Sequence, residues 1–132
     1  MTRNLALLLL GSSVALVAAQ QHSPLSEAQP GLWEVSGLGG AALPARQCVG
    51  DMTLLARFEH RTKACSANVV RQAGAMSVID YNCGAAGFGH SEVTLLTPRS
   101  LRIATQGISD GLPFNYVLQA HRIADCPGGA RH

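Results

Sequence analysis

The sequence has few charged residues and almost no lysine. Asp, Glu, Lys and Arg make up 14% of the 132 residues, and Lys63 is the only lysine among ten basic residues. The formal net charge is +2, and the one local group of basic residues is Arg57, Arg61 and Lys63. Nucleic-acid binding needs a denser basic surface. Disordered chains have fewer apolar residues than the 47% found here. The composition therefore argues against a nucleic-acid partner and against an intrinsically disordered chain.

The sequence also lacks the short motifs of common catalytic and metal sites. It contains no Cys-x-x-Cys pair, no His-Glu-x-x-His motif and no Gly-x-Ser-x-Gly turn, and no P-loop lysine follows the glycine-rich segment 84–89. Among the five histidines, His90 and His121 could approach each other across strands and form a weak metal site with Glu92. Solvent-facing histidines are the favoured alternative. We therefore predict no catalytic residue, no metal site and no cofactor, which favours a protein that is not an enzyme.

The only long apolar stretch lies at the N-terminus. Arg3 precedes the apolar segments 5–10 and 14–17, and small residues follow at 18–19, which is typical of a secretory signal peptide cleaved after Ala19. The apolar run is short and interrupted at 11–13, so a transmembrane helix is disfavoured. The sequence predicts an exported protein with no membrane span after cleavage. We expect a signal peptide at 1–19, a flexible lead-in at 20–29, a single β-rich domain at 30–126 and a frayed tail at 127–132.

Four cysteines follow the predicted export signal, at Cys48, Cys65, Cys83 and Cys126. An even number of cysteines in an exported chain indicates two disulfides, for which three connectivities exist. We favour Cys48–Cys65 and Cys83–Cys126, because each bridge would then join the two ends of one structural unit. A bridge of this kind contributes about 3–4 kcal/mol in the loop-entropy account.

Two consecutive β-hairpins are predicted between Glu92 and Cys126. Asp110-Gly111 is typical of a two-residue hairpin turn. Counting outward from it pairs Thr105 with Tyr116, Ile103 with Leu118 and Leu101 with Ala120, which places the apolar residues on one face. The preceding hairpin turns at Thr97-Pro98-Arg99. A three-residue loop there sets Leu95 opposite Leu101 and Val93 opposite Ile103, and so keeps the same apolar face.

The rest of the domain is predicted to add strands and one short helix. Segment 30–36 alternates as a strand with Trp33 facing the core. A second strand is expected at 43–49, a helix capped by Asp51 at 52–60, and two strands at 68–72 and 75–83 before a wide turn at 84–89. The expected fold is all-β, mainly an antiparallel meander, with a curved or barrel-like form left open, one short helix and two disulfides.

The two ends of this domain resemble a known family. Its opening residues Pro-Gly-Leu-Trp-Glu-Val at 30–35, its closing residues Arg-Ile-Ala-Asp-Cys at 122–126 and the order of the four cysteines are similar to the exported bacterial "domain of unknown function 3617" family. The resemblance spans about 29–126. It implies a small periplasmic protein of Gram-negative bacteria and assigns no activity. The chain departs from the family pattern after Cys48, where Val-Gly-Asp replaces a Leu-Thr-Pro-type helix start, and it lacks methionine-rich segments.

Two functions are consistent with these features. The first is a non-enzymatic module that binds a small apolar ligand inside a curved sheet, with aromatic lining residues Trp33, Tyr81, Phe88, Phe114 and Tyr116. The alternative is a structural or protein-interaction module of the cell envelope, which would bind an envelope protein through a sheet edge or the 84–89 loop. An enzyme is the least favoured class.

Overall fold

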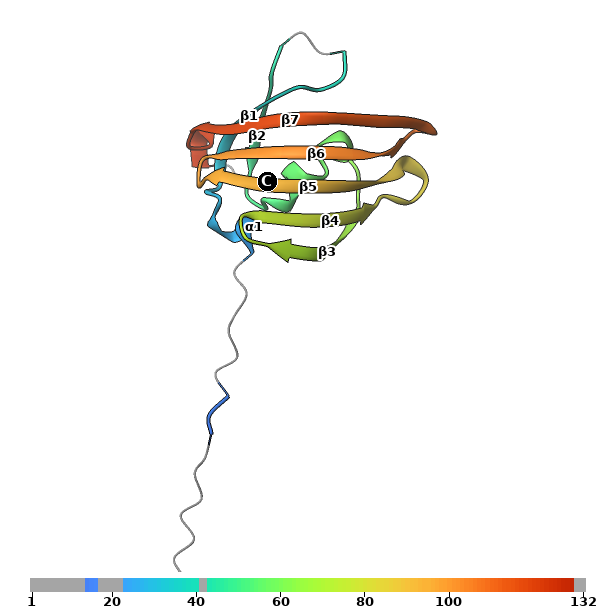
Figure 1. The fold of residues 1–132 in the computed structure, drawn as a ribbon. Coiled ribbons are helices and arrows are strands. Elements are labelled where there is room, and N and C mark those ends of the chain that lie inside the picture. The colour runs from blue at the N-terminus through green and yellow to red at the C-terminus, as the bar shows by residue number, and fades with distance from the viewer. Residues whose placement is uncertain (1–13, 17–22, 41–42, 130–132) are drawn as a thin grey trace, which may run out of the picture.

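The structure, a computed structural model, describes residues 14–16, 23–40 and 43–129. The predicted signal peptide and its cleavage site fall almost entirely outside these ranges. The β-rich domain is an open, seven-stranded antiparallel sheet with strand order β2-β1-β7-β6-β5-β4-β3 (Figure 1). The strands are β1 (Gly31–Ser36), β2 (Ala45–Val49), β3 (Ser66–Ala73), β4 (Met76–Asn82), β5 (Gly87–Thr97), β6 (Ser100–Ser109) and β7 (Leu112–Ala124). The predicted all-β antiparallel architecture is confirmed, and β3 to β7 form the expected meander. The sheet does not close into a barrel, because β2 and β3 are its two edges.

The β6–β7 hairpin has the register that its turn predicts. Asp110 and Gly111 form the two-residue turn, with φ of 48° and 81°. Asp tolerates this left-handed conformation and Gly adopts it without steric cost. Thr105 pairs with Tyr116 and Ile103 with Leu118. The apolar residues of both strands therefore face the same side of the sheet.

The β5–β6 hairpin also has the predicted pairing, reached by a different loop. Val93 lies opposite Ile103, as expected. Thr97 pairs with Ser100 across a two-residue turn, and the register shifts between Leu95 and Thr97. A β-bulge absorbs one extra residue in this way without moving the apolar face.

The core lies between one face of the sheet and the short helical segments. These segments are α1 (Pro24–Glu27), α2 (Thr53–Ala56) and the 3₁₀ turn η1 (Phe58–His60). Trp33 has no exposed surface, and its indole Nε1 donates to the Gln29 carbonyl at 3.0 Å. Leu55 and Phe58 are buried against the sheet as the helical spacing predicts. The predicted helix at 52–60 is therefore present as two shorter turns. The Asp51 carboxylate accepts from the backbone N–H at the start of α2, 3.0 Å away.

Part of the predicted flexible lead-in belongs to the folded domain. Residues 24–27 form α1, and Leu25 and Ala28 are only 6% and 4% exposed. These apolar side chains pack against the core, so this part of the lead-in contributes to the hydrophobic core of the domain. The predicted frayed tail begins with a 3₁₀ turn, η3 (Pro127–Gly129), and its last three residues lie outside the described ranges.

The predicted disulfide pairing is wrong. The bridges are Cys48–Cys126 and Cys65–Cys83, with Cα–Cα distances of 5.6 and 4.1 Å. Ser66 lies opposite Asn82 in the β3–β4 hairpin, so the next residue on each strand is a cysteine facing its partner. The other bridge forms because β1 pairs with both β2 and β7, which brings the ends of β2 and β7 together at the start of β1.

Candidate functional site

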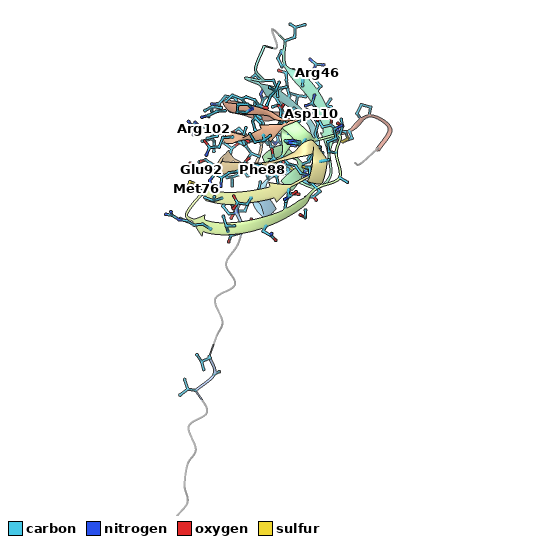
Figure 2. All side chains as sticks on the ribbon, turned by 90° about the vertical axis from the view of Figure 1, so that its right-hand side faces the viewer. Arg46, Met76, Phe88, Glu92, Arg102 and Asp110 are labelled. Carbon is cyan, nitrogen blue, oxygen red and sulfur yellow. A yellow bond between two sulfur atoms is a disulfide. The ribbon has the colours of Figure 1, made fainter. Side chains whose placement is uncertain are left out.

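The two faces of the sheet differ in what covers them. The core face is packed by α1, α2 and η1, whereas no described helix or strand covers the opposite face, which we call the outer face. Side chains alternate between the faces along each strand. Met76, Glu92 and Arg102 project from the outer side in Figure 2. The outer face is therefore the free side of the sheet on which a ligand could lie.

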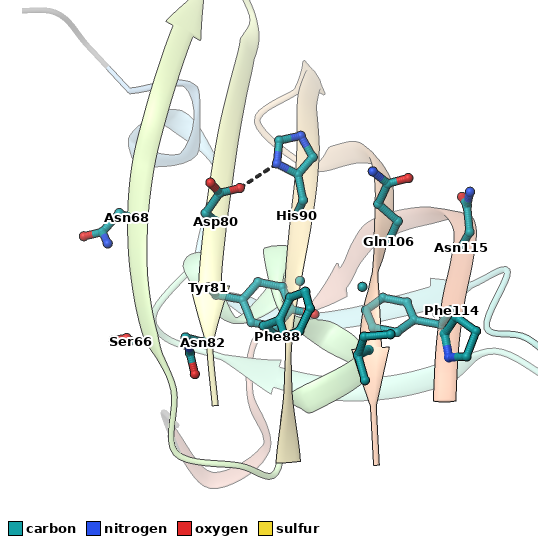
Figure 3. Close-up of a pocket in the computed structure, with 14 residues that line it drawn as sticks. Ser66, Asn68, Asp80, Tyr81, Asn82, Phe88, His90, Gln106, Phe114 and Asn115 are labelled. Carbon is teal, nitrogen blue, oxygen red and sulfur yellow. Dashed lines mark hydrogen bonds and ion pairs between the residues drawn. The ribbon is translucent and has the colours of Figure 1, made fainter. Parts of the chain in front are cut away.

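An open groove of about 740 Å³ crosses this outer face from β3 to β7 (Figure 3). Strand pairing places five polar side chains in one row across it, one from each strand. We call this set the polar row: Asn68, Asp80, His90, Gln106 and Asn115. Each member is the direct cross-strand partner of the next. The row therefore presents a line of hydrogen-bonding groups at the spacing of the strands.

A second row runs beside the polar row, two residues along each strand. It is polar on β3 and β4, with Ser66 and Asn82, and apolar on β5, β6 and β7. The apolar members, which we call the apolar row, are Phe88, Ile108 and Pro113. Phe88 is 53% exposed. An exposed aromatic ring next to Ile108, with Pro113 beyond it, offers a small platform to the apolar face of a ligand.

Two ionisable side chains stand in the polar row, and they contact each other. His90 Nδ1 lies 2.5 Å from Asp80 Oδ1. The carboxylate accepts from Nδ1, which leaves His90 Nε2 as the second hydrogen-bonding atom of the ring. Among the described residues, none forms a hydrogen bond with the side-chain amides of Asn68, Gln106 or Asn115. These amides are exposed and free to bind a ligand.

The floor of the groove, between the two rows, includes two glycines and therefore has no side chain at two of its positions. Gly89 lies opposite Gly107 in the β5–β6 ladder. A Cβ on Gly89 would lie 2.4 Å from the Tyr81 ring, and one on Gly107 would lie 2.1 Å from the Phe88 carbonyl oxygen. Neither position accepts a side chain without displacing its neighbour. The floor positions on β4 and β7 are Tyr81 and Phe114, whose rings point to the core face.

Behind the floor, a buried histidine ties the η1 turn to the sheet. His60 is 2% exposed, and its Nε2 lies 3.0 Å from the Ala86 carbonyl oxygen while its Nδ1 lies 3.1 Å from the Tyr81 hydroxyl. A carbonyl oxygen only accepts, so Nε2 carries the hydrogen, and in this tautomer Nδ1 accepts from the Tyr81 hydroxyl. The His60 ring also contacts Tyr81 and Phe114, at centroid distances of 5.4 and 5.8 Å. This contact set holds the floor of the groove in place from the core side.

The two tyrosines of the chain are both shielded from ionisation. Burial raises the pKa of Tyr81 to about 12. Burial also raises the pKa of Tyr116, and the hydrogen bond that its hydroxyl donates to the Glu59 carboxylate raises it further. Both hydroxyls therefore act as hydrogen-bond donors inside the fold at neutral pH.

The predicted aromatic lining residues separate into three places. Phe88 alone points into the groove, and Tyr81 and Phe114 lie at floor positions with their rings on the core face. Tyr116 packs against Phe114 at a centroid distance of 5.6 Å, and Trp33 belongs to the core. Sequence reasoning did not single out the polar row. Counting the same hairpin registers outward on the other face would have found part of it, since Gln106 and Asn115 were already paired by the turn.

The candidate metal set is not assembled by the fold. His90 is paired with Asp80, whereas His121 lies 3.6 Å from Glu34 at the other end of the β7 strand. Within residues 14–16, 23–40 and 43–129, no group of three or more His, Cys, Asp or Glu side chains is arranged to hold a metal ion. In the same part of the chain, no helix has the length and apolarity needed to cross a membrane.

No family model, curated protein or solved structure matches this chain. The resemblance of its two ends to the exported "domain of unknown function 3617" family therefore stays a prediction.

Proposed function

We propose that this protein is an exported, periplasmic binding protein without catalytic activity, and that the groove on the outer face is its ligand site. The observation that carries the proposal is the placement of Phe88. A large aromatic side chain is 53% exposed on the open face of the sheet, at the second residue of β5, beside a row of polar groups that have free hydrogen-bonding capacity. Small-ligand sites combine an apolar surface with a few polar groups that fix orientation.

The chemistry of the groove supports binding rather than catalysis. Asp80 holds His90 through Nδ1, an arrangement that orients an imidazole. The other groove side chains within the described residues are amides, a serine and apolar groups, and the groove offers no lysine, arginine or cysteine. In nucleophilic catalysis the nucleophilic side chain lies within hydrogen-bond reach of its base. His90 could serve as such a base, but its hydrogen-bond partner is the Asp80 carboxylate and not a nucleophile.

The proposal is tested with Nile red, a neutral dye whose emission shifts to the blue in an apolar site. The folded, disulfide-bonded protein is titrated with the dye, and Phe88→Ala is compared with Leu96→Ala. Leu96 is 56% exposed on the same strand but lies outside the groove, so it is a matched control. We expect saturable binding that Phe88→Ala weakens about tenfold, since loss of an aromatic contact costs roughly 1.5 kcal/mol. Equal binding by the two variants would place the dye elsewhere and contradict the proposal.

A second function, attachment to an envelope protein, is favoured by the edge strand β3. Its residues are exposed along almost the whole strand, and Val69 and Val70 are 47% and 53% exposed. An open edge pairs readily with a strand of another protein. The register shift between Val69 and Arg71 places a bulge in this edge, which weakens such pairing. A photo-cross-linker at Val70 that captures one defined partner in intact cells, when the same probe at Val117 captures none, would support this second function.

A further inference from the structure

We propose that the groove holds a linear, neutral oligosaccharide that lies across the strands, with one sugar unit at each member of the polar row. This inference rests on the proposed function and adds the chemical class of the ligand. It is carried by four features of the groove: its lack of lysine and arginine, its amide side chains, their spacing and the adjacent apolar row.

The groove offers no free charged group for an ionic ligand. Its carboxylate and its imidazole, those of Asp80 and His90, contact each other, so each already has a partner. Phosphates, carboxylates and nucleic acids are recognised by clustered lysine and arginine, and the groove contains neither. A cationic ligand would find one carboxylate, which is already engaged. The favoured ligand therefore carries no charge.

The amide side chains match a ligand rich in hydroxyl groups. Asn68, Gln106 and Asn115 each offer one acceptor oxygen and two donor hydrogens, and all three are exposed. A hydroxyl group is both donor and acceptor, so a sugar satisfies such an amide from either side. A purely apolar ligand would cover these three amides without giving them partners, which costs free energy.

The spacing of the polar row separates a sugar chain from a peptide. Adjacent strands lie about 4.8 Å apart, which is close to the repeat of one hexose in an extended chain. An extended peptide presents side chains on the same side about every 6.7 Å, because successive side chains alternate. The side chains of a peptide lying across the strands would therefore no longer coincide with the members of the polar row after two or three strands. A chain of hexoses can place one unit at each member of the polar row on all five strands.

The apolar row gives the sugar rings a surface to pack on. One face of a hexose ring carries mainly C–H groups, and these pack on the negative face of an aromatic ring. Phe88 lies beside His90 and Gln106 of the polar row, in the centre of the groove. A sugar unit there would place its ring on Phe88 and its hydroxyls against the polar row. The five strands span roughly 19 Å, which sets the length of the bound segment at about five units.

The test uses β-1,4-linked glucose oligomers, from the disaccharide to the hexasaccharide, titrated into the ¹⁵N-labelled folded protein and followed by amide chemical shifts. We expect shifts at residues of the two rows. We expect the dissociation constant to fall by about tenfold or more from the disaccharide to the pentasaccharide, because each added amide contact contributes roughly fivefold. Little further change is expected for the hexasaccharide, which extends beyond the last strand.

Variants place the binding in the groove. Asn115→Ala should weaken pentasaccharide binding about fivefold, whereas Gln119→Ala, which removes an exposed amide from the same face of β7 outside the groove, should leave it unchanged. The inference would be overturned if Asn115→Ala left the ligand-induced amide shifts and the affinity unchanged, or if the affinity did not rise with chain length. If the glucose oligomers give no shifts while Nile red still binds in a Phe88-dependent manner, the sugar assignment fails and the binding proposal stands. If neither ligand binds, both fail.

Discussion

Gly89 lies directly opposite Gly107 in the β5–β6 ladder, and the ring of Tyr81 covers the position where a Cβ on Gly89 would stand. An aromatic ring packed over a strand glycine compensates for the missing side chain. In this protein the hydroxyl of the same tyrosine also donates a hydrogen bond to His60 Nδ1. The glycine pair thus connects the floor of the outer groove to the buried contacts that hold η1 against the sheet.

Gly89→Ala is expected to destabilise the fold. The new Cβ would lie 2.4 Å from the Tyr81 ring and would push it from its contact with His60. Overpacking of this kind costs about 1–3 kcal/mol, which urea unfolding will measure. Gly39→Ala is the matched control, because its Cβ would meet only the Tyr116 ring at 3.8 Å, an ordinary contact distance. Equal stability of the two variants would show that the Tyr81 ring yields without cost.

Tyr81→Phe isolates the hydrogen bond from the packing. Phenylalanine keeps the ring over Gly89 but removes the hydroxyl that lies 3.1 Å from His60 Nδ1. A buried acceptor then lacks a partner, which costs about 1–3 kcal/mol in the free energy of unfolding. Tyr116→Phe provides the comparison, since Glu59 is more exposed than His60 and water can replace the lost donor. We expect the smaller loss for Tyr116→Phe, and the reverse order would contradict the assigned role of His60.

Alkaline pH is expected to unfold the protein through its two tyrosines. The pKa of Tyr81 is raised to about 12 in the folded state, while an unfolded tyrosine titrates near 10. Between these values the unfolded chain releases a proton that the folded chain keeps. Stability is therefore fully present below pH 10 and is lost as the pH rises towards 12, and the raised pKa of Tyr116 acts in the same direction.

Tyrosinate absorbance measures this directly, because the chain has only two tyrosines. In the folded protein neither should titrate near pH 10, and absorbance should rise together with the loss of circular dichroism. The same titration in guanidinium chloride gives the unfolded reference. A reversible tyrosine titration near pH 10 with the fold intact would show that a hydroxyl is open to solvent.

The hairpins could be predicted from sequence because their information is local. Asp110-Gly111 fixes a turn, and alternation then fixes which residues pair, so Ile103 opposite Leu118 followed from counting. Counting outward from a turn at Gly74, between β3 and β4, would have brought Cys65 within about one residue of Cys83. The preferred pairing instead assumed that each bridge joins the two ends of one structural unit. The groove escaped prediction for a related reason. Its polar row depends on the registers of four strand pairs. Phe88 was grouped with aromatic residues that the fold places on the other face.

Contacts between the two ends of the chain were out of reach for such local reasoning. The pairing of β1 with β7 joins segments that are far apart in sequence, and only this pairing brings Cys48 near Cys126. No turn signal or alternation pattern in either segment names the other as its partner. The burial of Leu25 was missed on similar grounds, since one apolar residue in a polar segment shows its role only when the sheet beneath it is known.

The two disulfides are expected to differ in their contribution to stability. Cys48–Cys126 joins residues separated by 78 positions, and Cys65–Cys83 by 18. In the loop-entropy account a bridge restricts the unfolded chain more when its loop is longer, giving about 4.5 kcal/mol for the first and about 3 kcal/mol for the second. Replacing each pair by alanine and measuring urea unfolding tests this order, with peptide mapping of the unreduced protein confirming which bridge is present. In the folded state the Cys65–Cys83 bridge joins the residue before β3 to the residue after β4. A larger loss for the Cys65–Cys83 pair would mean that this folded-state role outweighs its effect on the unfolded chain.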